Sequence, residues 1–171
     1  DWQGEAGGDV DIIADIFSKK CSGEPLACAV SGWAMSRVDG EISPAASNPS
    51  GAFRNFRKSC TKELYAPSCT GLGELYLEGV GTEADEEKGV AYILEGCEGE
   101  DWWGCYRLGE LYAEGRGVPM DPVRAFELHQ SACAEGVVMS CIRQASAYEK
   151  GLGVSQDLAM AAEYYGQGCR E

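Results

Sequence analysis

The chain has 171 residues, of which 44% are hydrophobic and 25% are charged, a composition typical of a globular domain. Its formal net charge is −14, and residues 71–114 hold twelve Asp or Glu against Lys88 and Arg107 alone. This balance disfavours nucleic acid as a partner, because phosphate binding requires basic residues. No apolar run in the sequence approaches the length that crosses a membrane.

The N-terminal part of the sequence shows three segments of different character. Residues 1–8 are rich in glycine and predict a flexible N-terminus. Residues 9–27 include "DVDIIADIFSKKC", which predicts a capping helix. Residues 28–68 begin "CAVSGWAMSRVDG", continue into "EISPAASNPSG" and end in a second helical stretch that runs to Cys60. Because Pro, Ser and Asn favour turns, the middle of this segment predicts a long loop.

From Cys69 onward the sequence repeats itself every 36 residues. "CTGLGELYLEGVGT" begins at Cys69, "CYRLGELYAEGRGV" at Cys105 and "CIRQASAYEKGLGV" at Cys141. A fixed period indicates a repeat protein, in which each repeat buries its apolar face against its neighbours. Residues 69–104, 105–140 and 141–171 are therefore regular repeats, and residues 28–68 are a divergent repeat. Together with the capping helix, they predict a single repeat domain over 9–171.

Each repeat predicts a hairpin of two helices. Leu108, Leu111 and Tyr112 stand at i, i+3 and i+4, which places them on one face of a first helix. The following "EGRGV" contains two glycines, as expected where the chain reverses with positive φ. Asp121 and Pro122 then suit the N-cap and the first position of a second helix.

Small residues recur inside both helices of the hairpin. The first helix has Gly73 and Gly109 after its leading leucine, and a mid-helix glycine costs about 1 kcal/mol relative to alanine. We therefore expect these positions to allow a partner helix to approach closely. The equivalent small residues elsewhere are Gly32, Gly89, Ala125, Ala145 and Ala161. The only histidine, His129, stands at a packing position and is expected to be a buried filler rather than a catalytic group.

The repeat frame L-G-x-L-Y-x-x-G-x-G, followed by an Asp, a small residue and "SAC", resembles the Sel-one-like repeat. More narrowly, it resembles the cysteine-rich, Hcp-type secreted proteins that are built from this repeat. The resemblance is strong over Cys69–Cys169, weak over Cys28–Cys60 and absent from residues 1–20. It implies an all-α fold, a right-handed α/α superhelix (solenoid) with a concave surface that contacts proteins. By this resemblance, the residues expected to bind a partner are Trp33, Thr70, Glu74, Tyr106, Glu110, Ile142 and Ser146.

The nine cysteines indicate disulfide bonds. The chain has no C-x-x-C and one histidine, which disfavours zinc. Disulfides would place the protein in an oxidising compartment, the periplasm or the cell exterior. Adjacent pairing and within-hairpin pairing both respect the repeat, and loop-closure entropy differs too little to choose between them. The resemblance implies adjacent pairing, with Cys169 left unpaired, through the bonds Cys21–Cys28, Cys60–Cys69, Cys97–Cys105 and Cys133–Cys141.

One short motif suggests an enzyme. "SCTK" at Ser59–Lys62 matches the S-x-x-K of penicillin-recognising enzymes, and Hcp-type proteins are sometimes labelled β-lactamases. The companion motifs S-D-N and K-T-G are missing. We therefore predict that the protein is not an enzyme and that it uses no cofactor and no metal.

These observations together predict an exported, non-enzymatic scaffold that binds proteins or peptides. The acidic repeats suggest an acidic concave surface and a basic partner. The alternatives are a weak β-lactamase or penicillin-binding activity, and an inhibitor or immunity protein that masks a secreted toxin. A dimer through the C-terminal repeat edge or through Cys169 is a further expectation.

Overall fold

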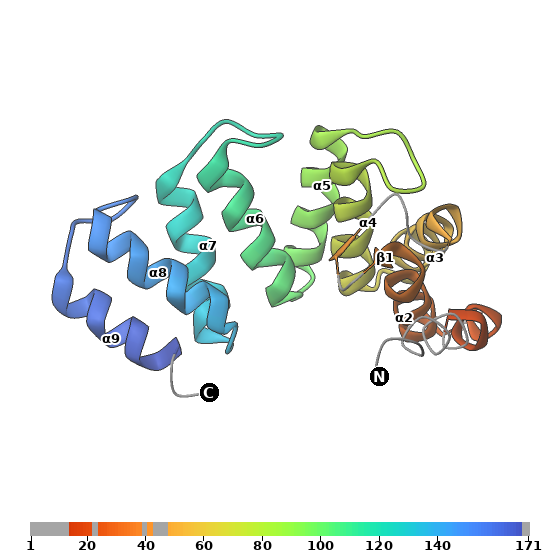
Figure 1. Cartoon of the computed structure of the whole chain (residues 1–171), viewed down its shortest axis with the longest axis horizontal. Coiled ribbons are helices and arrows are strands. Elements are labelled where there is room, and N and C mark those ends of the chain that lie inside the picture. Colours follow the sequence, from red (N-terminus) through yellow and green to blue (C-terminus); the bar gives the residue numbers. More distant parts are fainter. Residues whose placement is uncertain (1–13, 22–23, 39–40, 43–47, 169–171) are drawn as a thin grey trace, which may run out of the picture. The chain divides into compact units, whose positions relative to one another are not determined.

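The computed structural model describes residues 14–21, 24–38, 41–42 and 48–168, and Figure 1 shows their succession of helices. Residues 14–20 are helical. The helices that follow are α2 (Pro25–Ser36), α3 (Pro49–Glu63), α4 (Ala66–Glu78), α5 (Glu86–Glu98), α6 (Trp102–Glu114), α7 (Pro122–Ala134), α8 (Val138–Lys150) and α9 (Leu158–Gly168). The chain forms two compact units, an N-terminal unit over residues 1–99 and a C-terminal unit over residues 100–171.

Each unit contains two helical hairpins. In the N-terminal unit α2 packs against α3 and α4 against α5, and in the C-terminal unit α6 packs against α7 and α8 against α9. Consecutive hairpins also touch within each unit, through α3 and α4 or through α7 and α8. The prediction of helical-hairpin repeats is therefore confirmed. None of the described helices is long and apolar enough to span a bilayer.

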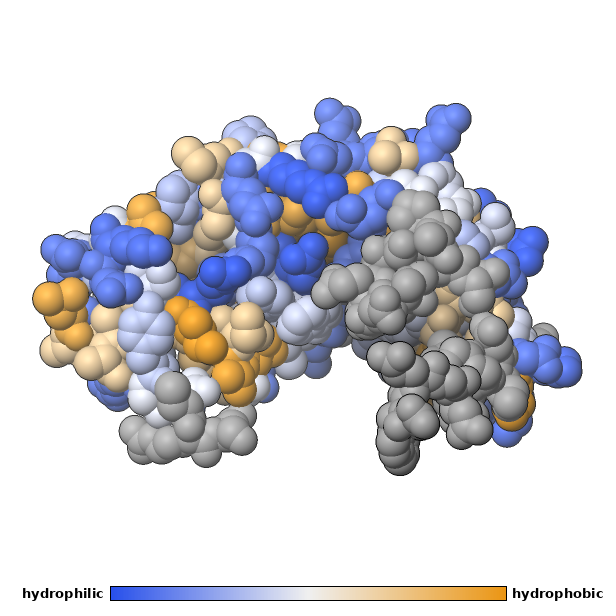
Figure 2. Space-filling view, in the orientation of Figure 1, coloured by the Kyte–Doolittle hydropathy of each residue, from blue (hydrophilic) through white to orange (hydrophobic). Residues whose placement is uncertain are grey.

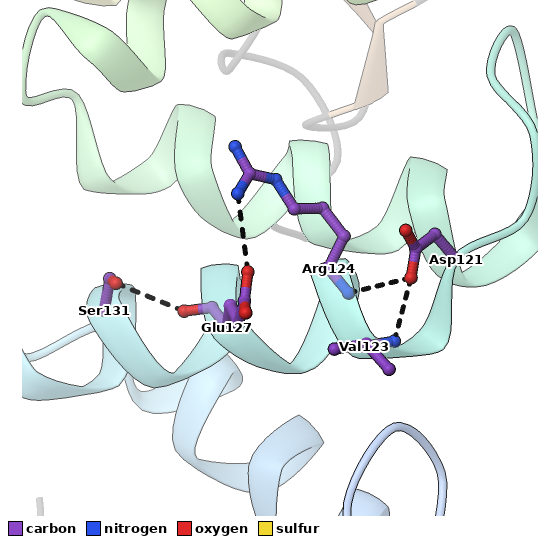
Figure 3. Close-up of polar contacts among 5 residues, drawn as sticks. All are labelled: Asp121, Val123, Arg124, Glu127 and Ser131. Atoms are coloured by element: carbon purple, nitrogen blue, oxygen red, sulfur yellow. Dashed lines mark hydrogen bonds and ion pairs between the residues drawn. The ribbon is translucent and has the colours of Figure 1, made fainter.

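The helix ends follow the capping residues that the sequence predicts. Asp121 accepts hydrogen bonds from the backbone N–H groups of Val123 and Arg124, at 3.1 and 3.0 Å, at the start of α7 (Figure 3). Asp85 accepts in the same way at the start of α5. At the other end, Gly115 closes α6 with a φ of 70°, a left-handed conformation that favours glycine.

The small residues of the hairpins mark positions of close helix approach. A Cβ on Gly73 would lie 2.5 Å from the backbone oxygen of Gly89, so α4 and α5 meet almost backbone to backbone. A Cβ on Gly109 would lie 2.7 Å from the imidazole of His129. His129 itself is buried, as expected of a filler. The mid-helix glycines are therefore explained by packing.

The core of the N-terminal unit is centred on Phe56 of α3. This ring is fully buried and packs with Leu72 and Leu75 of α4. A Cβ on Gly32 of α2 would lie 2.8 Å from the ring, and Trp33 meets it edge-on with ring centroids 5.1 Å apart. The divergent repeat thus packs against the first regular repeat through one large side chain.

An aromatic triad occurs once in each unit. In the N-terminal unit Phe53 meets Tyr76 edge-on at 5.3 Å, and Tyr76 stacks on Tyr92 at 5.6 Å. The C-terminal unit repeats this arrangement, with an edge-on contact at 5.3 Å and a stacked contact at 5.7 Å. Its three members are Phe126, Tyr148 and Tyr164. In both units the triad connects the second helix of one hairpin to both helices of the next.

The segment between α2 and α3 differs from the prediction. The sequence predicts only a loop there, whereas β1 (Arg37–Val38) pairs antiparallel with β2 (Glu41–Ile42). The pairing is two residues long on each strand, too short to produce a recognisable alternation of apolar and polar residues. The rest of the predicted loop, residues 43–47, lies outside the described residues, as do 1–13 of the N-terminal segment.

Disulfide bonds join the end of one helix to the start of the next along the chain. Three bonds have Cα separations of 4.5 to 4.7 Å, and they join Cys21–Cys28, Cys60–Cys69 and Cys133–Cys141. Cys97 and Cys105 are also disulfide-bonded. Cys169 lies outside the described residues. Cys60–Cys69 and Cys133–Cys141 each link one hairpin to the next within a unit, and Cys21–Cys28 links the N-terminal helix to α2. The chain is therefore a helical, disulfide-stapled repeat protein.

Candidate functional site

The structure places the predicted partner-binding residues of the N-terminal unit largely inside the protein. Thr70 is fully buried and Glu74 is 7% exposed, although both were expected on a contact surface. Trp33 is half-buried against Phe56. Thr70 packs against Gly96 of α5 so closely that a Cβ on Gly96 would clash with its side chain. Thr70 and Glu74 therefore expose little surface to a partner.

In the C-terminal unit, Glu110 is the buried centre of a charge cluster. Nη2 of Arg143 donates to its Oε2 at 2.7 Å, and Nε2 of His129 lies 3.4 Å from its Oε1. The hydroxyl of Tyr106 donates to Oε2 at 3.4 Å. The carboxylate of Glu110 comes from α6, the imidazole of His129 from α7 and the guanidinium of Arg143 from α8. The cluster therefore joins these three helices.

The cluster keeps Glu110 ionised. Burial alone would raise the pKa of its carboxyl, but the hydrogen bond from His129 and the charge and hydrogen bond of Arg143 hold that pKa below its ordinary value. For Arg143, partial burial opposes the charged form, and the carboxylate of Glu110 outweighs it, so the pKa of the guanidinium is raised. Each partner thus stabilises the charged form of the other.

A pocket of about 380 Å³ opens beside this cluster, and we call it the C-terminal pocket. Its polar lining comes mainly from α6 and α8, with His129 added from α7. Glu110 and Glu114 contribute from α6, and Arg143, Ser146 and Lys150 contribute from α8. Two predicted partner-binding residues, Glu110 and Ser146, thus line one pocket. Ile142 and Tyr106 lie on the same helices without lining it.

The remainder of the C-terminal pocket is mostly apolar. Phe126 of α7 and Ala147 of α8 line it, together with Met120 and Leu152 from the loops after α6 and α8. Met120 is 67% exposed and Leu152 is 51% exposed, so both present apolar surface to solvent at the pocket. In Figure 2, hydrophobic and hydrophilic surface lie next to each other over α8 and α9. The pocket therefore combines an apolar interior with charged residues of both signs.

Sequence reasoning did not single out Arg143, Lys150, Met120 or Leu152. One signal for Lys150 was present, because the two preceding repeats have Glu78 and Glu114 at its position. Met120 and Leu152 gave no comparable signal, since each stands in a glycine-containing loop where side-chain direction does not follow helical periodicity. Only the folded loops bring them to the pocket.

At the S-x-x-K motif, the serine that would act as the nucleophile is not accessible to a substrate. Ser59 is fully buried, and its hydroxyl donates to the backbone oxygen of Pro25 at 3.2 Å. Lys62, the other member of the motif, is exposed. A serine that acylates must reach its substrate and a base. The geometry therefore does not support a β-lactamase reaction at Ser59.

A group of possible metal ligands also has another explanation. Cys60, Cys69 and Glu95 lie close enough together to share an ion. However, Cys60 and Cys69 are joined in a disulfide and cannot supply thiolates. Among the described residues this group is therefore a structural bridge beside an exposed carboxylate.

The fold and the junction disulfides define a class of protein built from tandem helical hairpins. The sequence pattern of the Sel1 repeat matches residues 66–101, 104–137 and 139–171, which together are more than half of the chain. The chain belongs to the Sel1 repeat family. No curated protein matches the sequence.

Solved structures with a similar fold include three Sel1-like proteins. A protective antigen of uropathogenic Escherichia coli, described as having an SLR fold, has 25% identity and a TM-score of 0.78 over 91% of this chain. A Sel1 repeat protein from Oxalobacter formigenes has 24% identity and a TM-score of 0.76 over 86% of this chain. Cysteine rich protein B of Helicobacter pylori has 23% identity and a TM-score of 0.59 over 81% of this chain.

The lengths of these proteins differ. This chain spans 32% of the Escherichia coli antigen, 58% of the Oxalobacter protein and 96% of the Helicobacter protein. The shared feature is therefore the repeat fold.

Proposed function

We propose that this protein is a non-enzymatic scaffold that binds other proteins in an oxidising compartment outside the cytoplasm. The observation that carries the proposal is the run of three Sel1 repeats, since this repeat commonly serves as a protein–protein interaction scaffold. Tandem hairpins suit this role because they present an extended surface on a rigid frame. The buried Ser59 supports the absence of a hydrolytic role.

The cysteines support the proposed location. Disulfides persist in the periplasm or outside the cell and are rare in the reducing cytosol. Eight cysteines of this chain are disulfide-bonded. A cysteine rich protein of Helicobacter pylori shares the fold, which agrees with this placement. Periplasmic or secreted localisation is accordingly part of the proposal.

The charge of the chain supports a basic partner. Acidic side chains that are exposed on the N-terminal unit raise the local concentration of a positively charged protein and speed its association. They include Glu78, Glu83, Glu86, Glu87, Glu95 and Glu98. A secreted basic toxin, masked by this protein as an inhibitor or immunity partner, has the same chemistry and is the second candidate.

Capture of a partner under oxidising conditions tests this function. The oxidised full chain is immobilised, an extract of the compartment is passed over it at low and at high salt, and retained proteins are identified. We expect a basic protein whose retention falls with salt. The double variant Glu95→Lys and Glu98→Lys should retain less of it, and the matched exposed change Glu163→Lys should not. If no protein is retained specifically, the scaffold function is wrong.

Hydrolysis of nitrocefin tests the enzymatic alternative. We expect the wild type to show no turnover above the uncatalysed rate, and Ser59→Ala and the exposed Lys62→Ala to behave identically. If the wild type hydrolyses nitrocefin and Ser59→Ala abolishes this turnover without changing the circular dichroism spectrum, the protein has a β-lactamase activity that depends on Ser59.

A further inference from the structure

We propose that the C-terminal pocket binds a peptide segment in which one apolar side chain lies between an acidic residue and a basic residue. The proposal rests on the proposed protein-binding function and names the class of segment that one site would take. It has three supports, namely the apolar interior of the pocket, the charges on its two sides and a change of charge along the repeats.

The apolar interior suits a single large side chain. The volume of about 380 Å³ exceeds that of one hydrophobic side chain, so an anchor residue fits with part of its backbone. Met120 and Leu152 are more than half exposed at the pocket, and Phe126 is half-buried in it. Covering these side chains removes apolar surface from water, which is the usual driving force of an anchor.

The two sides of the pocket carry opposite charges. The α6 side presents carboxylates at Glu110 and Glu114, and the α8 side presents cations at Arg143 and Lys150. Glu110 is already engaged by Arg143 at 2.7 Å and by His129 at 3.4 Å. The exposed acid on the α6 side is therefore Glu114, and it favours a basic residue of the segment there.

The α8 side favours an acidic residue. Arg143 uses Nη2 for Glu110, and a guanidinium carries five N–H donors, so further donors remain for a second carboxylate. Lys150 lies two helical turns along the same helix, about 10.5 Å away along its axis. A carboxylate that enters between them meets two cations.

The charge on the α8 side departs from the repeat. The two preceding repeats place acids at the equivalent positions, Glu74 with Glu78 and Glu110 with Glu114, whereas α8 has Ser146 and Lys150. This change creates a pocket with both signs of charge in a chain whose net charge is −14. A segment with both charges therefore suits this pocket.

Binding of designed peptides to the oxidised full chain tests the proposal. Four fluorescent peptides have the same length. Three of them carry a leucine between two charged residues, which are Glu and Lys, two Lys, or two Glu. The fourth carries a serine between Glu and Lys. Fluorescence anisotropy gives their affinities. We expect the Glu–Leu–Lys peptide to bind about three- to tenfold tighter than either uniformly charged peptide, since two rim charges each contribute modestly. The serine peptide should bind least.

Two exposed substitutions change the expected order of affinities. Glu114→Lys makes both sides basic and should favour the peptide with Glu on both sides. Lys150→Glu leaves Arg143 beside an added carboxylate on the α8 side, so it should shift the preference away from an acidic residue there and toward the peptide with Lys on both sides. The double variant Met120→Ser and Leu152→Ser should weaken the binding of all three leucine peptides to the same extent. Circular dichroism of each variant confirms that the fold is retained.

The outcomes separate this proposal from the broader function. If the peptide with Lys on both sides binds the wild type tightest, or if the substitutions leave the order unchanged, the pocket proposal is wrong. If no peptide binds while a protein partner is still captured, the pocket proposal fails and the scaffold function stands. If neither peptide nor partner binds, both fail.

Discussion

Gln144 occupies a position where the two preceding repeats have Leu72 and Leu108. Its side chain is 1% exposed, and neither its amide nitrogen nor its amide oxygen has a hydrogen-bond partner among the described residues. A buried polar group without a partner costs about 1–3 kcal/mol. The repeat therefore contains a destabilising residue at a site that its own sequence pattern identifies as apolar.

Replacing this glutamine with the residue of the other repeats should stabilise the protein. We expect Gln144→Leu to raise the free energy of unfolding by about 1–2 kcal/mol, because the unpaired amide is removed and the volume is kept. This corresponds to a rise in Tm of about 2–4 °C per kcal/mol. The matched change Leu108→Gln should lower Tm. A fall in Tm for Gln144→Leu in thermal unfolding would contradict this explanation.

Glu110 shows where residue-level prediction succeeded and failed. Its place beside a small residue on the first helix was predictable from the repeat, and a position on a concave, partner-binding surface was inferred from the family resemblance. The structure instead buries it under Arg143 and His129. Periodicity identifies which face of its own helix a residue occupies, but it does not identify the side chains that neighbouring helices place opposite.

The ion pair of Glu110 makes a pH-dependent contribution to stability. Its pKa is held below the ordinary value of 4.5, so the carboxylate stabilises the fold above that pH and loses this contribution as pH falls through the lowered pKa. Near pH 7, we expect Glu110→Gln to lower the free energy of unfolding by about 1–3 kcal/mol.

Urea unfolding of the wild type and of Glu110→Gln over a pH series measures this contribution. The difference in the free energy of unfolding between the wild type and Glu110→Gln should narrow below pH 4.5, because the carboxylate of Glu110 becomes protonated as pH falls through its lowered pKa. Glu127→Gln is the control, because its exposed pair with Arg124 at 3.4 Å should contribute no more than about 0.5 kcal/mol. A gap that stays constant with pH would mean that the charge of Glu110 does not stabilise the fold.

Helices were the most predictable elements, because their ends depend on local chemistry. Asp85 and Asp121 cap second helices, and glycines such as Gly115 end first helices, where the sequence placed them. The aromatic triads were not predicted. Tyr76 and Tyr148 are visible in the repeat, but their contacts require knowing which face of the next hairpin each ring meets.

The triad contacts predict that replacing tyrosines at equivalent repeat positions lowers the stability of the protein by different amounts. Tyr76 contacts Phe53 and Tyr92, whereas Tyr112, at the same position one repeat later, makes no ring contact among the described residues. Each aromatic pair contributes about 0.5–1.5 kcal/mol beyond its buried area. Tyr76→Leu should therefore lower the free energy of unfolding by about 1–3 kcal/mol more than Tyr112→Leu. Equal losses in chemical unfolding would show that the triad adds nothing specific.

At the scale of the whole molecule, the disulfides illustrate a limit of sequence reasoning. The 36-residue period shows that the cysteines belong to the repeat. It leaves two pairing schemes, because closing short or long loops differs little in entropy. The structure joins cysteines seven to nine residues apart, from the end of one helix to the start of the next. That choice depends on which helix ends lie next to each other.

Reduction should therefore destabilise the whole chain. Each loop of this length contributes about 2.5 kcal/mol in the chain-entropy model, so losing all the bonds removes a large part of a typical domain's stability. We expect reductant to lower Tm well beyond the effect of any single substitution above. Thermal scans with and without reductant, with free thiols blocked afterwards and counted by mass spectrometry, measure this. An unchanged Tm in fully reduced protein would show that packing alone holds the hairpins.

The short span of the bonds also bears on how such a protein is made. Each bond joins cysteines that follow one another closely along the chain. A polypeptide that emerges N-terminus first can oxidise one junction before the cysteines of the next have appeared. Maturation can then proceed in order along the chain, with few wrong partners present at any moment and little need for an isomerase to reshuffle them.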